Sequence, residues 1–171
     1  EIRVEYANDT TFNNLNISWD NFRVFNGILH NTETTLPTLY VDSVHGSDSS
    51  SGDILSPLQN LFVATAWAKR GSTVVLYSGL YNPSEIGHKN LSIIGANGST
   101  AIITSAFVQD TTGSNWENSC LTFHDCKGLI SNINFTQAIE GIYAEDTWDL
   151  EISKCQIYDT STAIRFVEYS K

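Results

Sequence analysis

The sequence predicts an all-β protein that folds as a parallel β-helix, a solenoid of short strands, with one short capping helix near its start. The C-terminal third repeats itself every 21 or 22 residues, and each repeat holds several short apolar pieces separated by turn residues. One coil of that size is too small to bury its own apolar face, so coils must stack on one another. Only one helical pattern interrupts this texture.

The repeat is visible as aligned apolar positions. The aligned sets are Leu121 with Ile142 and Ile164, Phe123 with Ala144 and Phe166, Leu129 with Leu150, Ile133 with Cys155, and Phe135 with Ile157. In stacked coils such equivalents lie about 4.8 Å apart, which is one strand spacing. The repeat lacks the leucine and asparagine pattern of leucine-rich repeats. The absence of this pattern favours a solenoid of strands without intervening helices.

Composition limits the classes of partner. A chain of 171 residues with 16% charged residues can build one real core, and its polarity comes from Ser, Thr and Asn, which favour turns and sheet surfaces. The net charge of −10 argues against nucleic acid or an anionic membrane as a direct partner. No apolar run approaches the roughly 20 residues of a membrane span, so direct membrane insertion is not expected.

Residues 1–35 read as a separate N-terminal arm or cap segment. Polar residues alternate there with the aromatic side chains of Phe12, Trp19, Phe22 and Phe25. Leaving so many aromatic side chains in water is costly, and we therefore expect the segment to pack against another protein surface. It is either a cap on the same domain or an arm that docks on another subunit.

The β-helix itself is expected over residues 36–171, with its capping helix at about 57–69. Pro57 suits the start of a helix, and Gly71 follows its end. Leu58, Leu61, Phe62 and Trp67 would then cover the apolar end of the first coil. The preceding loop carries Asp48 and Asp53, which we expect to accept turn amides, with a calcium site as the alternative.

The opening of this region is a series of short motifs in a fixed order, which are Tyr40-Val41-Asp42, Gly46-Ser47-Asp48, Gly52, Pro57, the helix, Gly71-Ser72-Thr73-Val74-Val75-Leu76 and Gly79-Leu80-Tyr81. This series resembles the opening of right-handed parallel β-helix proteins of the pectate-lyase-like superfamily. The resemblance covers about residues 39–171 and implies a right-handed solenoid. It is weak for function, because the superfamily includes lyases, hydrolases, esterases, phage tailspikes, adhesins and non-catalytic surface proteins.

Glycosylation motifs indicate a secreted chain. Asn-x-Ser/Thr sequons occur at five positions, which are Asn8, Asn16, Asn90, Asn97 and Asn134. Both Asn and Ser/Thr are abundant, so chance is the alternative source of these motifs. A start at Glu1 rather than Met suggests a processed chain, and the last residues look like the middle of a coil, so the β-helix is expected to continue.

The three cysteines do not define a disulfide framework. Cys120, Cys126 and Cys155 cannot all pair within the chain, and they match no zinc spacing. Cys155 takes the position of Ile133 in the preceding repeat, which predicts a small core hydrophobe. Whether Cys120 and Cys126 are bonded to each other stays open, since they flank a strand.

Acidic residues recur just past the inward strands. Asp125, Asp146 and Glu168 fall in register, and three stacked carboxylates repel one another unless a cation neutralises them. Calcium could do this, and Trp116 and Trp148 could stack on sugar rings, which gives a candidate cation or saccharide site. The alternatives are that these acids occupy solvated turns, or that two of them form a glycosidase pair. No other cofactor is expected.

The sequence favours a structural function over catalysis. We expect an extracellular or cell-surface glycoprotein whose β-helix is a structural or adhesive rod, which self-associates or joins other subunits in fibres and could bind carbohydrate. No catalytic residue can be assigned, because the superfamily's basic proton abstractor and paired-aspartate motifs have no clear match. The alternatives are a polysaccharide-active lyase or glycoside hydrolase, and a viral or phage fibre or tailspike protein.

Overall fold

The computed structural model describes residues 24–25, 28–29, 38–105 and 119–168. The chain divides into two units, Glu1–Thr35 and Leu36–Lys171. In the first unit, β1 (Val24–Phe25) pairs antiparallel with β2 (Ile28–Leu29). The aromatic residues Phe12, Trp19 and Phe22 of the predicted arm lie outside the described residues.

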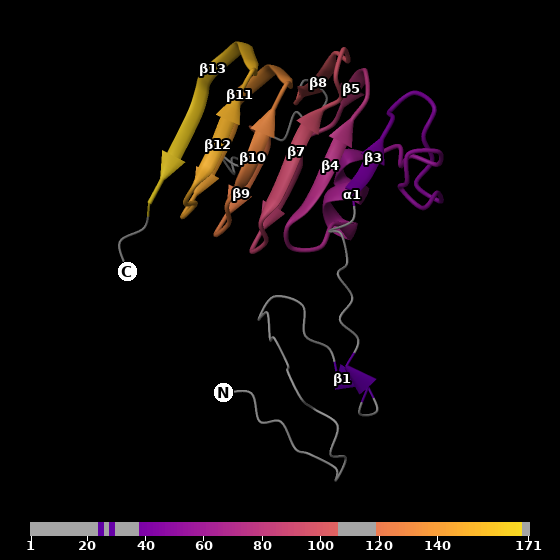
Figure 1. The fold of residues 1–171 in the computed structure, drawn as a ribbon. Coiled ribbons are helices and arrows are strands. Elements are labelled where there is room, and N and C mark those ends of the chain that lie inside the picture. The colour runs from indigo at the N-terminus through magenta and orange to yellow at the C-terminus, as the bar shows by residue number, and fades with distance from the viewer. Residues whose placement is uncertain (1–23, 26–27, 30–37, 106–118, 169–171) are drawn as a thin grey trace. The chain divides into compact units, whose positions relative to one another are not determined.

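The second unit contains a five-stranded parallel sheet. Its strands are β3 (Thr38–Val41), β4 (Ser72–Leu76), β7 (Leu91–Gly95), β10 (Gly128–Ser131) and β12 (Leu150–Ser153). They are hydrogen-bonded in the order β12-β10-β7-β4-β3, and Figure 1 shows them side by side. Each successive strand along the sheet therefore comes from the next layer of the chain.

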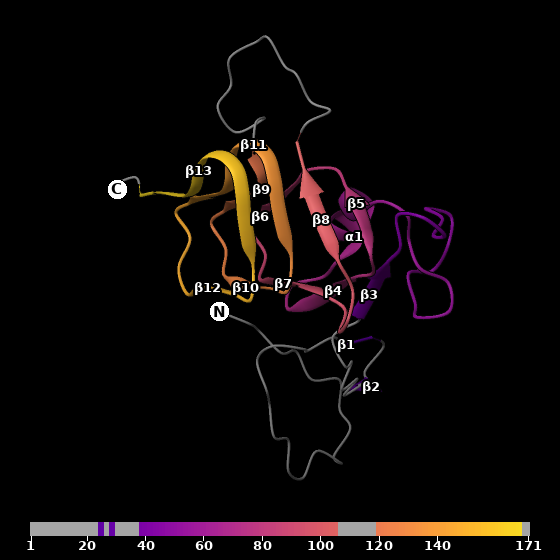
Figure 2. The ribbon, with the colours of Figure 1, turned by 90° about the horizontal axis from the view of Figure 1, so that it is seen from above.

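A six-stranded parallel sheet lies opposite. Its strands are β5 (Gly79–Tyr81), β6 (Ser84–Gly87), β8 (Ala101–Thr104), β9 (Ser119–His124), β11 (Asn134–Glu145) and β13 (Gln156–Val167). The long strand β11 pairs with β8 through its first residues and with β9 through its last residues, while β13 pairs along its other edge. Figure 2 shows the two sheets facing each other.

The prediction of one right-handed parallel β-helix is wrong. The described strands form two separate parallel sheets of five and six strands, and neither sheet closes into a solenoid. The sequence repeat misled here because its period reports which residues lie in register on neighbouring strands. It carries no information on how the pieces of one layer join. The capping helix of that prediction is present as one short helix, described below.

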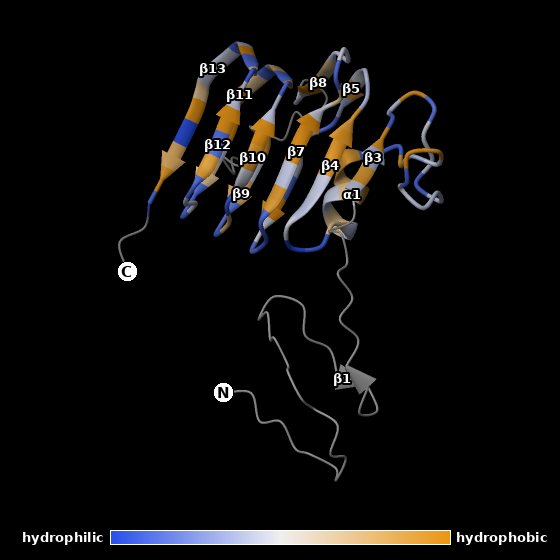
Figure 3. Ribbon diagram, in the orientation of Figure 1, coloured by the Kyte–Doolittle hydropathy of each residue, from blue (hydrophilic) through white to orange (hydrophobic). Residues whose placement is uncertain are grey.

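The apolar residues of both sheets form a single core. Alternate residues of the five-stranded sheet, such as Val74, Ile93 and Ile130, are fully buried, as are Phe135 and Ile142 of β11. Figure 3 shows the resulting alternation of apolar and polar residues along the strands. Burying one such side chain stabilises the fold by about 1.5–3 kcal/mol, so the stacked apolar rows hold the layers together.

Most of the predicted register is confirmed. Ile142 pairs with Leu121 on one side and Ile164 on the other, and Phe135 pairs with Ile157. The alignment of Leu129 with Leu150 is wrong by one residue, because Leu150 pairs with Gly128. The reason is an extra residue in the turn between Glu145 and Leu150, compared with the turn between His124 and Gly128.

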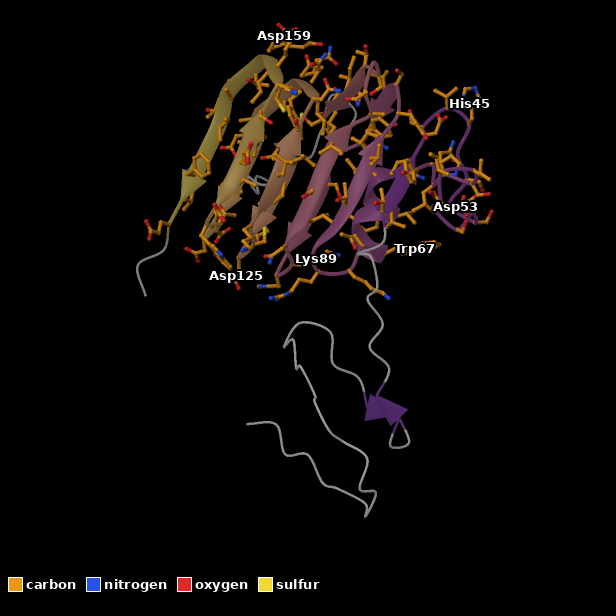
Figure 4. All side chains as sticks on the ribbon, in the orientation of Figure 1. His45, Asp53, Trp67, Lys89, Asp125 and Asp159 are labelled. Atoms are coloured by element: carbon orange, nitrogen blue, oxygen red, sulfur yellow. The ribbon has the colours of Figure 1, made fainter. Side chains whose placement is uncertain are left out.

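Left-handed backbone positions recur at the turns between strands. His88, Asp125 and Asp146 have φ values of 56°, 47° and 48°, and each donates its backbone N–H to the next layer. Asn132 and Lys154 repeat the pattern at 58° and 54°. Asn and Asp tolerate this conformation better than most residues, so it marks the corners of the layers. Figure 4 shows Asp159 above and Asp125 below the strands.

The helix α1 (Leu61–Trp67) is shorter than predicted and begins later. Leu58 is not helical, because it forms a parallel bridge with Val41. The prediction that Phe62 and Trp67 cover the apolar end is also wrong, since these side chains are 64% and 52% exposed. Leu58 and Leu61 do enter the core, as does Ala64, so the buried stripe of the helix is narrower than expected.

The acidic residues of the loop before α1 are structural, as predicted. Asp48 Oδ1 accepts the backbone amides of Gln59 at 3.1 Å and Asn60 at 2.9 Å, directly before the first turn of the helix. Asp53 Oδ1 accepts the amides of Leu55 and Ser56. These hydrogen bonds fix the loop and supply an acceptor where a helix has unpaired N–H groups.

Candidate functional site

A histidine between two carboxylates is the most concentrated group of ionisable side chains in the described residues. His124, at the end of β9, places Nδ1 at 2.9 Å from Glu145 Oε2 and Nε2 at 3.6 Å from Glu85 Oε1. The side chains of His124 and Glu145 are 25% and 26% exposed, so solvent still reaches them. We call Glu85, His124 and Glu145 the histidine cluster.

Strand pairing brings the cluster together from three strands. Glu145 lies opposite His124 in the register of β11 and β9, and Glu85 lies opposite Thr122 in the register of β6 and β9. Because neighbouring strands hold equivalent residues about 4.8 Å apart, His124 can reach a carboxylate on either side. The cluster therefore spans β6, β9 and β11 of the six-stranded sheet.

A second polar group lies beside the histidine cluster. Glu140 is almost fully buried, and its carboxylate accepts hydrogen bonds from Arg165 Nη1 at 3.0 Å and from Ser119 Oγ at 3.2 Å. The Arg165 guanidinium also lies 6.0 Å from the ring centroid of Tyr143. The buried carboxylate thus has a charged partner, as buried acids require.

The geometry of the histidine cluster suits proton transfer. A carboxylate that accepts from Nδ1–H orients the imidazole and leaves Nε2 to exchange a proton. Here Glu145 has the orienting position, and Glu85 lies near Nε2 at a longer distance. When the imidazole is protonated, both carboxylates lie within ion-pair distance of it, so the cluster also links β6, β9 and β11 electrostatically.

The predicted row of acidic residues, Asp125, Asp146 and Glu168, lies at one corner of the layers. The backbone amide of Asp125 donates to Glu145 O, and that of Asp146 donates to Val167 O, directly before Glu168. Asp125 Oδ2 lies 3.2 Å from His88 Nδ1, and Glu168 is exposed. In the described part of the chain, no group of three His, Cys, Asp or Glu side chains is arranged to hold a metal ion. The calcium hypothesis stays a prediction.

The two tryptophans of the predicted saccharide site differ in status. Trp116 lies outside the described residues, and Trp148 is 52% exposed in the turn before β12. Sequence reasoning missed Glu85 and His88. Glu85 reaches the cluster through the pairing of β6 with β9, whose residues are separated by more than one repeat.

The sequons lie in different environments. Asn97 is exposed in the turn between β7 and β8, whereas Asn90 and Asn134 are half-buried at the starts of strands. Asn8 and Asn16 lie outside the described residues. Of the three described sequons, Asn97 is therefore the most accessible to a modifying enzyme.

The edge formed by β12 and β13 is open. Within the described residues, β12 pairs with β10 alone and β13 with β11 alone. The apolar residues that continue the core pattern here are only partly covered, and Phe166 is 62% exposed. A strand edge of this kind presents unpaired N–H and C=O groups to a partner.

The opposite edge, at β3, is covered by the chain itself. The Tyr40 amide donates to Gly52 O at 2.8 Å, and the Leu58 amide donates to Tyr40 O at 2.9 Å. The Asp42 amide adds a third bond to Leu58 O. The loop before α1 therefore satisfies the edge of β3, and the two ends of the stack differ.

The described cysteines are free. Cys120 and Cys126 are buried, and burial raises the pKa of each thiol to about 11. Cys155 is partly buried against the core, in the position that the repeat assigned to it, and burial raises its pKa as well. Thiols in such surroundings pack as small hydrophobes.

The described helix is too short to cross a membrane, and no other described segment forms a longer one. Comparison with protein-family models, curated proteins and solved structures finds no match to this chain. The resemblance to the pectate-lyase-like superfamily therefore stays a prediction from the sequence.

Proposed function

We propose that this chain is a structural or adhesive module of an extracellular or cell-surface glycoprotein, and that copies of it associate through the β12–β13 edge. The observation that carries the proposal is the exposure of core-type residues at this edge. At this edge, Ile152, Ile157 and Ile164 are only partly buried. Their register partners one layer earlier, Ile130, Phe135 and Ile142, are fully buried.

Association at this edge would be favourable for two physical reasons. Apolar surface removed from water contributes about 25 cal/mol per Å². Unpaired backbone groups of an edge strand gain partners when another strand is added, which is a common mode of protein recognition. The covered edge at β3 offers neither gain.

The extracellular part of the proposal rests on the sequons, and Asn97 in particular has the exposure that a glycan acceptor requires. The test is expression through the secretory pathway of a eukaryotic host, with the intact mass measured before and after enzymatic removal of N-glycans. The proposal predicts a mass loss on treatment. A secreted chain whose mass does not change would contradict it.

A polysaccharide-active enzyme is the second candidate, because the histidine cluster has the geometry of a general acid–base group. The wild type would be compared with His124→Gln and Glu145→Gln variants on acidic and neutral polysaccharides, with new reducing ends as the readout. Cleavage that is lost in both variants would support this candidate. A wild type that produces no new ends would contradict it.

A further inference from the structure

We propose that the Asn97–Gly98 turn is a self-modification site, at which the Asn97 amide converts through a cyclic succinimide into aspartate and isoaspartate. The turn links β7 to β8, and Asn97 and Gly98 are both exposed. The inference does not depend on the proposed function, because the reaction needs only the chain and water.

The attacking group is the backbone nitrogen of Gly98. The neighbouring amides are hydrogen-bonded, since Ala96 N donates to Leu76 O at 2.8 Å and Ser99 N donates to Ala96 O at 3.0 Å. Within residues 38–105 and 119–168, no hydrogen bond engages Gly98 N–H. Gly98 has a φ of 74°, and the space where a Cβ would stand is open. The nucleophile is therefore free of both a competing acceptor and a side chain that would hinder its approach.

The bonds balance as follows. The Gly98 nitrogen forms a bond to Asn97 Cγ, the Cγ–Nδ2 bond breaks, and the proton from the Gly98 amide leaves with Nδ2 as ammonia. Water then opens the five-membered ring. Attack at Cγ gives aspartate, and attack at the main-chain carbonyl carbon gives isoaspartate, in which the backbone runs through the former side chain. The net change is one water consumed, one ammonia released and one negative charge gained.

The other described sequons provide matched controls in the same molecule. Asn90 and Asn134 are followed by Leu91 and Phe135, which are fully buried strand residues with bulky side chains. The amide that would have to attack at Asn90, Leu91 N, donates to Lys127 O. Asn90 therefore lacks a free nucleophile, and Asn134 is followed by a bulky side chain in a buried strand, so we expect both to stay intact while Asn97 converts.

The same residue is the most accessible sequon, so the two modifications compete. A glycan on Asn97 would be attached to Nδ2, the nitrogen that leaves in the first step. A glycosylated Asn97 is therefore expected to be protected. Deamidation before glycosylation would in turn destroy the acceptor, because an aspartate has no amide nitrogen to modify.

The experiment uses the full chain made in bacteria, without glycans, and held folded in mildly alkaline buffer at physiological temperature. Samples are digested at mildly acidic pH and mapped by mass spectrometry, with isoaspartate scored by an isoaspartyl methyltransferase. The expected result is a product that accumulates in the Asn97 peptide over time, faster at higher pH, with Asn90 and Asn134 unchanged. The sequence has a second Asn–Gly pair, Asn26–Gly27, whose conversion is measured separately in its own peptide.

Two variants sharpen the test. Asn97→Gln lengthens the side chain, which disfavours ring closure, and should abolish the product. Ser99→Ala removes the sequon and keeps the Asn97–Gly98 pair, so it should still convert. An Asn97 that stays intact in the folded chain, or converts no faster than Asn90 and Asn134, would overturn the proposal.

Discussion

Phe166 of β13 lies beside Ala144 of β11 in parallel register, yet Ala144 is 1% exposed and Phe166 is 62% exposed. The same contrast holds for Ile142, which is fully buried, and its partner Ile164, which is only partly buried. The last layer thus keeps the apolar pattern of a core strand while one of its edges faces outward. This difference is the structural basis for the proposed association.

Gly128→Ala should destabilise the fold. A Cβ built on Gly128 would collide with the main-chain carbonyl oxygen of Leu91 on the neighbouring strand β7, and backbone cannot move aside cheaply. Overpacking of this kind costs about 1–3 kcal/mol. The free energy of unfolding, measured by chemical denaturation, is expected to fall by that amount.

Gly87→Ala is the matched control for that variant. Gly87 also lies in a parallel strand, but a Cβ there would meet nothing within 4 Å. Its stability should stay within about 0.5 kcal/mol of the wild type. Equal losses of unfolding free energy in the two variants would show that the close approach of Gly128 to Leu91 is not the cause of the destabilisation.

Lys89→Met should loosen the end of α1. Lys89 Nζ donates to the main-chain oxygens of Thr65 and Ala68, with the second distance 3.2 Å, and so satisfies carbonyls at the helix C-terminus. Loss of these bonds should cost about 1 kcal/mol of unfolding free energy. Lys127→Met is the control, because Lys127 is similarly half-buried and makes no such contact within the described residues. A loss in the control as large as in Lys89→Met would contradict the assignment.

Asp48 should make stability depend on pH. Burial alone would raise the pKa of Asp48, but hydrogen bonds from the Asn60 side chain and from the amides of Asn60 and Gln59 outweigh it and lower the pKa. A carboxyl whose pKa is lowered by folding stabilises the fold above its unfolded pKa, and this stabilisation is lost as pH falls through the folded value.

The comparison is between the wild type and Asp48→Asn, with the free energy of unfolding measured over a pH series. The advantage of the wild type should be constant from neutral pH down to about pH 5 and should shrink below about pH 4. A difference that does not change with pH would mean that the charge of Asp48 contributes nothing.

Thiol labelling should separate the three cysteines. The thiolate is the reactive form, and burial raises the pKa of both Cys120 and Cys126 to about 11, so few thiolates form at neutral pH. Cys155 is only partly buried and should be labelled first in the folded chain, as measured by mass spectrometry after a short exposure. In denaturant all three should react alike. Rapid native labelling of Cys120 or Cys126 would contradict their described burial.

Much of the local structure could be predicted from the sequence. The period identified which residues pair across layers, as in Leu121 with Ile142, because stacked strands require equivalent apolar residues in register. The roles of Asp48 and Asp53 followed from turn chemistry. The helix start was misplaced because Leu58 has the right helical spacing but bonds to β3 instead. Tertiary pairing overrode the local pattern.

The sheets and the histidine cluster could not be predicted in the same way. A repeat gives neighbours along the stack, but whether the pieces close into a solenoid depends on turn geometry, such as the left-handed positions at His88 and Asp125. Glu85 meets His124 only because β6 pairs with β9 across a long stretch of sequence. Contacts of that range leave no periodic signal.

The most direct test of the account is the self-association of the chain, measured by sedimentation velocity over a concentration series for the wild type, Phe166→Lys and Leu55→Lys. Both variants place a charge at an exposed apolar residue, but Phe166 lies on the β12–β13 edge and Leu55, 90% exposed, lies in the loop before α1. We predict that the wild type and Leu55→Lys associate and that Phe166→Lys sediments as a monomer. A wild type that stays monomeric, or a Phe166→Lys variant that associates as the wild type does, would contradict the proposed role of this edge.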